Sequence, residues 1–219
     1  MSQKTRKGRG YHHGDLKESL MESGVSIIQK QGPQGLTLKQ VAQEQGVSSA
    51  AVYRHYESKE HLLAAIGAQG FRMLEAALKK NLAEPVVDAR IFFRQCVQAY
   101  IDLALSRPRH YELMFGGIIP DHRRFPELQE AGQSAFSCLL ETIEVCQAAG
   151  LFRKRKPIII AFHVWGTMHG FVMLQISGQN PLEQKEKGSP KKRKQEIDSY
   201  VGLMVQLLRR GLDTDTGRR

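Results

Sequence analysis

A helix-turn-helix pattern over residues 37–59 constrains the fold of this chain more than any other part of the sequence. It predicts one short helix over 38–45 and a second helix that runs to about His55. Gly46 ends the first helix, because glycine readily adopts the left-handed conformation just past a helix end. Ser48 is a suitable N-cap for the second helix. The side chains that fill the angle between the two helices are small or β-branched, namely Val41, Ala42, Val47 and Val52. Such a pair of helices places its second helix in the major groove of DNA.

Packing alone is the alternative interpretation, since any compact helical hairpin can carry alanine, glycine and valine at these spacings. The residues that follow favour DNA. Tyr53, Arg54 and His55 crowd the end of the second helix, and Ser58 begins another helix with Lys59 in its first turn. A lysine at that position opposes the helix dipole, so we expect its partner to be a phosphate. The free amides at the start of the first helix also suit a phosphate.

The rest of the chain predicts helices as well. A first helix begins at Asp15 and stops at Gly32-Pro33, and a long helix runs from Ser58 to about Leu82. Beyond Pro85, helical periodicity continues at about 88–106, 110–115, 126–149, 157–176 and 195–210, with a polar flexible loop over 178–194. The sequence therefore predicts an all-α fold of about nine helices.

Charge supports a polyanionic partner. The chain carries a net charge of +10, and its pI is near 9.6, which favours association with nucleic acid. The basic clusters lie outside the motif, however, at 4–9, 153–156 and 191–194. They raise a sequence-tolerant architectural DNA-binding protein as the alternative function. Residues 1–12 form a basic flexible arm, either a minor-groove contact or a solvated tail.

Other function classes find little support. We find no paired carboxylates, nucleophile motif, phosphate loop or metal-ligand spacing, so we expect no enzyme activity, no cofactor and no metal. Cys96, Cys138 and Cys146 sit among apolar residues, which predicts buried reduced thiols in a cytoplasmic protein; a redox switch is the alternative. The stretch 157–177 has the length of a membrane span, but polar residues interrupt it, so we expect a buried packing helix.

Several segments carry a family resemblance. In the motif region these are Leu36-Thr37-Leu38, Val41-Ala42, Gly46-Val47-Ser48, Tyr53-Arg54-His55-Tyr56 and Ser58-Lys59. Further on they are Tyr111-Glu112-Leu113-Met114-Phe115-Gly116 and Trp165-Gly166-Thr167-Met168-His169-Gly170. Together they resemble the TetR/AcrR family of bacterial transcriptional regulators, with a C-terminal domain of the Trp-His-Gly type.

The resemblance implies a homodimer in which each protomer has a three-helix DNA-binding domain and a larger ligand-binding and dimerisation domain. Here these would be residues 13–60 and 85–212, joined by a connecting helix over 61–84. Members of the family are mostly repressors that a small-molecule effector releases from palindromic double-stranded DNA. A cytoplasmic, nucleoid-associated protein is therefore expected.

Matched position by position to the family pattern, one group of residues would contact DNA phosphates: Thr37, Ser48, Tyr53, His55 and Lys59. A second group would face the base edges: Ser49, Ala50, Ala51 and Arg54. Arginine can bond guanine through two hydrogen bonds, and an alanine methyl can meet the methyl of thymine. Tyr56 stands where the family places a buried aromatic residue, so we expect it in the core.

Aromatic and methionine side chains of the C-terminal half predict an apolar effector pocket. The candidates are Phe92, Phe93, Cys96, Tyr100, Met114, Phe115, Phe136, Leu139, Trp165, Met168, His169 and Met173. For each of them, an ordinary place in the helical core is the alternative. Few acidic residues accompany the set, so we expect a neutral or anionic apolar ligand.

The last two helices are the candidates for dimerisation, because both carry apolar stripes and the first carries two glycines four residues apart. The interface residues would be Gly166, Gly170, Ile197, Tyr200, Val201, Met204 and Leu208. Val205 and Leu207 would widen the stripe. Burial within the protomer is the alternative for this stripe.

Overall fold

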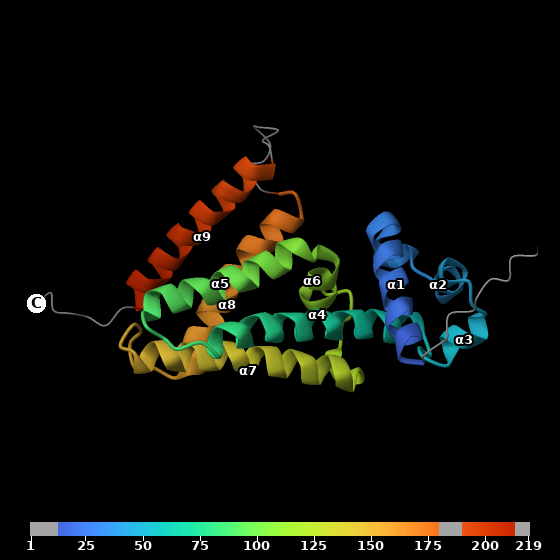
Figure 1. The fold of residues 1–219 in the computed structure, drawn as a ribbon, viewed down its shortest axis with the longest axis horizontal. Coiled ribbons are helices and arrows are strands. Elements are labelled where there is room, and N and C mark those ends of the chain that lie inside the picture. Colours follow the sequence, from blue (N-terminus) through green and yellow to red (C-terminus); the bar gives the residue numbers. More distant parts are fainter. Residues whose placement is uncertain (1–12, 180–189, 213–219) are drawn as a thin grey trace, which may run out of the picture.

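The computed structural model describes residues 13–179 and 190–212, and within these ranges it contains only helices (Figure 1). The α-helices are α1 (His13–Gly35), α2 (Leu38–Gln45), α3 (Ser49–Tyr53), α4 (Lys59–Leu82), α5 (Ala89–Ser106), α6 (Pro108–Phe115), α7 (Pro126–Ala148), α8 (Pro157–Ile176) and α9 (Pro190–Leu212). A short 3₁₀ helix, η1 (His122–Arg124), precedes α7. The all-α prediction with about nine helices is confirmed for the described part of the chain.

The helix boundaries around the motif follow from local capping. The Thr37 hydroxyl accepts from the Gln40 backbone N–H at 3.2 Å, while the Gln40 side chain accepts from the Thr37 N–H at 3.0 Å. This reciprocal capping box satisfies two amides that the first helical turn leaves free. Ser48 caps α3, and Gly46 adopts the left-handed conformation with φ of 67°. The predicted turn is therefore present at the predicted residues.

α4 is the central element of the molecule. It leaves the group of α1–α3 and runs into the larger group of helices, where α7 lies along it (Figure 1). It packs against α7, α6 and α5, and against α1 near its start. α8 packs on α5 and α7, and α9 crosses over α5. One helix is thus shared between the helix-turn-helix and the body of the protein.

α3 and α9 depart from the predicted boundaries. α3 ends at Tyr53, so Arg54 and His55 form the turn after it rather than its last residues. α9 begins at Pro190, so the basic residues 191–194 belong to a helix and not to the flexible loop that we predicted. Proline is tolerated in the first helical turn, and lysine and arginine are good helix formers. The predicted basic arm over 1–12 lies outside the described residues.

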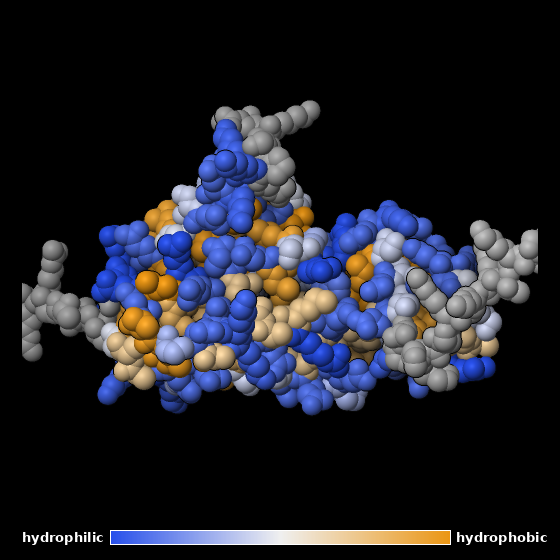
Figure 2. Space-filling view, in the orientation of Figure 1, coloured by the Kyte–Doolittle hydropathy of each residue, from blue (hydrophilic) through white to orange (hydrophobic). Residues whose placement is uncertain are grey.

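α8 is buried on one face only, which corrects the prediction of a buried packing helix. Phe162 and Leu174 are 53% and 49% exposed, and a Cβ added at Gly166 or Gly170 would meet no atom within 4 Å. By length and composition alone, α8 is also the one helix in the described ranges that could cross a membrane. Its open face lies beside α9, and Figure 2 shows apolar surface gathered on the body of the molecule around α9.

Candidate DNA interface and effector pocket

The candidate DNA contacts lie on the surface at one end of the molecule. Ser49, Ala50 and Arg54 are exposed at the two ends of α3, and Tyr53 is 57% exposed. The capping side chains are exposed too, while Ala51, His55 and Lys59 are half-buried. The structure therefore brings all nine predicted residues to the short loops and helix starts around α3, where a duplex can reach them.

Lys59 has a partner within the protein. Its ammonium donates to the backbone carbonyl oxygen of Gln34 at 2.9 Å. That carbonyl lies just beyond the kink of α1, where Gly32 has a φ of 73°. The contact accounts for a lysine in the first turn of α4 without any phosphate. Lys59 therefore does not require a phosphate partner, and its half-buried ammonium can still contact DNA.

Tyr56 lies in the core, as predicted. It is 2% exposed, and its hydroxyl donates to the backbone carbonyl of Lys17 at 3.1 Å. Burial raises the pKa of this phenol. A second link joins α2 to α1, where the Gln45 amide donates to the Ser23 hydroxyl at 2.7 Å. These contacts join α2 and the segment after α3 to α1.

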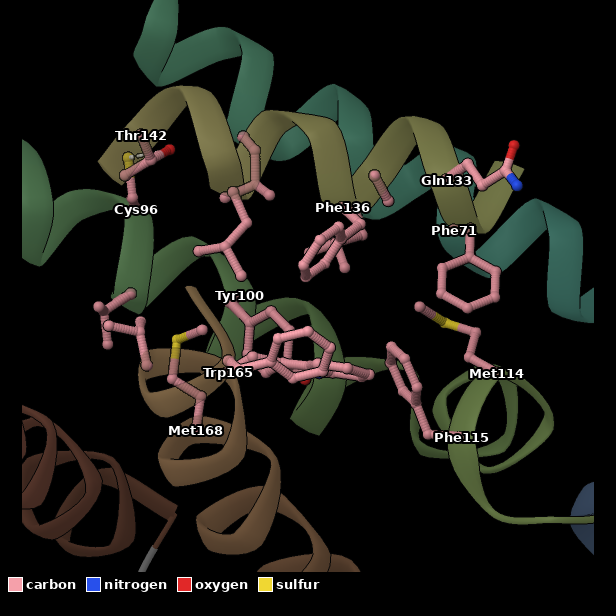
Figure 3. A pocket seen from close by; sticks show the side chains of 18 of the residues that line it. Phe71, Cys96, Tyr100, Met114, Phe115, Gln133, Phe136, Thr142, Trp165 and Met168 are labelled. Carbon is pink, nitrogen blue, oxygen red and sulfur yellow. Dashed lines mark hydrogen bonds between the residues drawn. The ribbon is translucent and has the colours of Figure 1, made fainter. Parts of the chain in front are cut away.

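A cavity of about 380 Å³ lies among α4, α5, α6, α7 and α8. Nine of the predicted pocket residues line it: Phe93, Cys96, Tyr100, Met114, Phe115, Phe136, Leu139, Trp165 and Met168. Figure 3 shows these side chains converging from several helices on one space. The sequence thus located most of the wall that α5 to α8 contribute.

Three predicted residues do not line the cavity. Phe92 is buried, but it lies one residue from Phe93 on α5 and so points about 100° away from it. Met173 lies toward the end of α8, beyond the lining residue Met168. His169 lies behind the lining rings of Phe115 and Trp165, which are 5.4 and 6.2 Å from its own ring.

The structure also adds lining residues that the sequence did not single out. The most informative are Phe71, Leu74 and Leu78 of α4, the helix that begins in the DNA-binding motif. Their spacing of three and four residues looks like any core stripe, so it gives no signal of a cavity. Gln129, Gly132 and Gln133 at the start of α7 complete one end.

A buried chain of hydrogen bonds runs behind the cavity wall. The Tyr100 and Tyr111 hydroxyl oxygens lie 2.6 Å apart, and the Tyr111 oxygen lies 2.8 Å from His169 Nδ1. Burial raises the pKa of Tyr100 to about 12 and also raises that of Tyr111. Burial lowers the pKa of His169, so its imidazole is neutral at pH 7. The chain links α5, α6 and α8 through one phenol.

The cavity wall carries no lysine, arginine, aspartate or glutamate side chain. Burial also lowers the pKa of His122, the one histidine in the wall, against the opposing effect of Asp121.

The three cysteines are buried, as predicted, and burial raises the pKa of Cys96 to about 11 and of Cys146 to about 12. Thiolates are therefore scarce at pH 7, which disfavours oxidation. The described residues include no group of side chains able to hold a metal ion.

The open apolar face lies between α8 and α9. A groove there is lined by Thr167 and Leu174 of α8 and by Leu203 and Leu207 of α9. Leu203 and Leu207 are 52% and 58% exposed, although both are leucines on a regular helix. Leu207 belongs to the stripe that the sequence predicts for the last helix, whereas Leu203 was not singled out.

One of the predicted interface residues is misplaced. Val201 is 1% exposed and belongs to the core of its own chain. Ile197, Met204 and Leu208 are half-buried against the same core, because this stripe of α9 faces α5. Tyr200, Gly166 and Gly170 are exposed, as an interface requires. Sequence periodicity found the apolar stripe of α9 but could not say whether it faces inward or outward.

Two models of known protein families match this chain. Residues 20–66 match the model described as bacterial regulatory proteins, tetR family. Residues 93–189 match the model described as tetracyclin repressor-like, C-terminal domain. The two matches lie in the expected order and together cover well over half of the chain. This protein belongs to the TetR family.

Relatives of this TetR-family chain agree with that assignment. The uncharacterized HTH-type transcriptional regulator Rv0681 of Mycobacterium tuberculosis is 24% identical over 74% of this chain and 71% of its own. A protein of unknown function from Rhodococcus sp. RHA1 has a solved structure with a TM-score of 0.77 and 30% identity, covering 94% of this chain and all of that one. The transcriptional regulator FadR of Bacillus subtilis, solved with stearoyl-CoA, shares the fold at a TM-score of 0.70 and 13% identity, over 89% of this chain and 98% of its own.

The TetR-family chain is thus a DNA-binding transcriptional regulator. Its helix-turn-helix reads DNA, and its C-terminal domain is of the kind found in the tetracycline repressor.

Proposed function

We propose that this regulator is a homodimeric repressor, which a small molecule releases from a palindromic operator by filling the cavity in its C-terminal domain. The observation that carries the proposal is the course of α4. This helix begins at Ser58, next to α3, and its residues Phe71, Leu74 and Leu78 form part of the cavity wall. A ligand that displaces this part of the wall therefore moves α4, the helix that also positions the recognition helix α3.

We assign DNA roles as the family pattern implies. Arg54, Ser49, Ala50 and Ala51 face base edges, whereas Thr37, Ser48, Tyr53, His55 and Lys59 contact phosphates. Base contacts specify the sequence, and phosphate contacts fix the register. The exposure of Arg54 and Tyr53 supports this division. The lining residues named above form the effector site.

Two protomers pair, in this proposal, through the open face of α8 and α9. The exposed glycines of α8 and the exposed leucines of α9 support a close, apolar helix contact. Residues 13–60 form the DNA-binding domain, 61–84 the connecting helix and 85–212 the ligand-binding and dimerisation domain. We assign the latter to the Trp-His-Gly subclass, because the bond between Tyr111 and His169 joins the two segments that carry its pattern.

The proposed protein works in the bacterial cytoplasm, bound to the nucleoid, and has no enzymatic role. That FadR of Bacillus subtilis, which has the same fold, was solved with stearoyl-CoA supports a small-molecule effector.

The decisive experiment is in two steps. Genomic fragments are first selected on the purified protein, and the bound fragments are examined for a palindrome. Metabolites are then titrated into the complex with that palindrome. Because coupling is reciprocal, a releasing ligand must bind the free protein more tightly than the operator complex by the same factor that it weakens operator binding. An unchanged ligand affinity would refute release, and equal affinity for palindrome and bulk DNA would favour an architectural role instead.

A further inference from the structure

We infer that the cavity takes a single unbranched alkyl or acyl chain, with its methyl end between Cys96 and Thr142 and its polar head at the rim formed by Gln133. This inference rests on the proposed effector role of the cavity. It adds the class of ligand and the direction in which the ligand lies.

The cavity has an elongated wall on α7. α7 lines the cavity with one continuous stripe of residues: Leu128, Gln129, Gly132, Gln133, Ala135, Phe136, Leu139 and Thr142. From Gln129 to Thr142 this stripe spans up to about 20 Å at 1.5 Å per residue. A volume of about 380 Å³ over that length leaves a cross-section on the order of 20 Å². The cavity is therefore long and about one hydrocarbon chain wide.

Exposure differs between the two ends of the α7 wall. Gln133 is exposed and Phe136 is half-buried, whereas Leu139 and Thr142 are buried. Figure 3 shows Gln133 at one end of the row, with its amide turned away from the space, and Thr142 with Cys96 at the other end. The cavity is thus closed at the Thr142 end, while its exposed lining side chains are Gln133 and Phe162, whose ring lies 5.7 Å from that of Phe136.

The polar side chains of the cavity wall differ in whether they already have hydrogen-bond partners. At the closed end the Thr142 hydroxyl already donates to the Cys138 carbonyl at 2.8 Å, and in the middle the Tyr100 hydroxyl is bonded to Tyr111. At the open end the amides of Gln129 and Gln133 make no hydrogen bond to any described residue. A ligand can therefore bury a methyl end without unpairing any polar group, and its head stays in water at the rim beside Gln133.

The absence of charge in the wall completes the assignment. A charged group carried deep into the cavity would lose its hydration without gaining an opposite charge. A polar head group at the rim keeps its hydration. The affinity therefore depends more on the alkyl chain than on the head group. Carboxylic acids, their coenzyme A esters and primary alcohols of the same chain share the recognised chemistry.

The length of the cavity predicts how the affinity depends on the number of carbons in the ligand chain. A chain that advances about 1.25 Å per carbon fills up to about 20 Å with 12–16 carbons. Below that length each added CH₂ raises affinity about fourfold, the equivalent of burying one methylene. Beyond it, further carbons find no space and the affinity levels off.

The test is a chain-length series measured by titration calorimetry on the full chain without DNA. Straight-chain acids of 8 to 18 carbons are compared with the alcohols and coenzyme A esters, below the concentrations at which they form micelles. A fused-ring acid, anthracene-9-carboxylate, is the shape control. The expected result is a steep rise, a break near 12–16 carbons and weak binding of the ring compound.

Variants locate the tail. Leu139→Phe fills the closed half and should move the break to shorter chains, with at least about tenfold loss for hexadecanoic acid and little for decanoic acid. Ser137→Phe, an exposed position on the same helix outside the wall, is the matched control. Val97→Leu adds one methylene to the wall from α5 and gives a second, milder version of the shift.

The outcomes separate this inference from the proposed function. Binding without chain-length dependence, an unmoved break in both lining variants, or tighter binding of the ring compound overturns the inference. If alkyl chains bind as expected but do not release the operator, the inference stands and the release model fails. If another metabolite releases the operator and no alkyl compound binds, the release model stands and the inference about the ligand fails.

Discussion

At the scale of single residues, Arg54 is the one strong candidate for reading a base. It is exposed at the end of α3, and its guanidinium has no ion pair within the described ranges. We predict that Arg54→Ala lowers operator affinity by roughly 1–3 kcal/mol and affects scrambled DNA much less. Lys59→Ala should instead weaken binding to both DNAs equally. It should also reduce the slope of log affinity against log salt concentration by about one. Fluorescence anisotropy at several salt concentrations measures both effects, and equal losses for Arg54→Ala on the two DNAs would remove its base-reading role.

Tyr111 carries the second prediction at this scale. Its hydroxyl bonds Tyr100 and His169 at once, so Tyr111→Phe leaves both partners short of a buried hydrogen bond. We expect the free energy of unfolding to fall by about 1–3 kcal/mol. Tyr53→Phe, at an exposed hydroxyl, should change it by less than about 0.5 kcal/mol. Urea unfolding followed by circular dichroism gives both values, and an unchanged Tyr111→Phe protein would mean that the chain of bonds contributes nothing to stability.

The residues predicted correctly from the sequence are those whose roles are local. Thr37, Ser48 and Ser58 cap helices through atoms three residues away, and sequence alone contains that information. Lys59 was interpreted without its partner because the Gln34 carbonyl lies 25 residues away and faces it only after α1 kinks. The hydrogen bond between Tyr111 and His169, 58 residues apart, was invisible for the same reason.

At the scale of elements, the closeness of α6 to α4 depends on Gly70. A Cβ there would lie 2.6 Å from Met114 Sδ and 3.1 Å from His110 Cβ. The methionine end can move, but the His110 Cβ is fixed to the backbone of α6, so α6 itself must shift. We predict that Gly70→Ala costs about 1–2 kcal/mol of stability, even after its gain in helix propensity.

Gly132 is the matched control for that prediction. It also lies within a helix, but a Cβ there would meet only Phe71 carbons at 3.5 Å, an ordinary contact. Gly132→Ala should therefore stabilise the protein by about 0.5–1 kcal/mol. Thermal unfolding of the two variants should shift in opposite directions, and a shift of both to higher temperature would show that α6 does not depend on a close approach.

Sequence predicted that each helix exists but not which way its faces point. α9 has an apolar stripe in which Val201 is buried and Leu207 is exposed. The sequence could not distinguish the two positions, because both side chains are apolar. α8 carries apolar residues around most of its circumference, with polar residues scattered among them, so its exposed face could not be read from periodicity. The cavity wall was predicted on α5, α6, α7 and α8 from aromatic and methionine content, but its α4 part resembles an ordinary core stripe.

At the scale of the whole molecule, three histidines make stability depend on pH. Burial lowers the pKa of His110, His122 and His169, with Arg107 adding to the effect on His110. As pH falls through about 6.5, the unfolded chain binds protons that the folded chain does not. Unfolding should therefore become easier between pH 7 and pH 5, before the carboxylates titrate. Urea unfolding across this range should show the loss, and His110→Gln should flatten it in part, because His122 and His169 still contribute.

Dimerisation through the open face of α8 and α9 can be tested without unfolding the protomer. Leu207 is 58% exposed, so Leu207→Glu should leave the thermal stability of an isolated protomer unchanged. At the centre of an apolar interface the same carboxylate loses its hydration, which should cost about 3 kcal/mol and raise the dimer Kd more than about a hundredfold. Gln206→Glu, exposed on the same helix but outside the groove, adds the same charge as a control. Sedimentation equilibrium should find a monomer only for Leu207→Glu, and the monomer should bind a single half-site but lose its preference for the full palindrome. A Leu207→Glu protein that remains dimeric would place the interface elsewhere and leave the exposed leucines of α9 without a role.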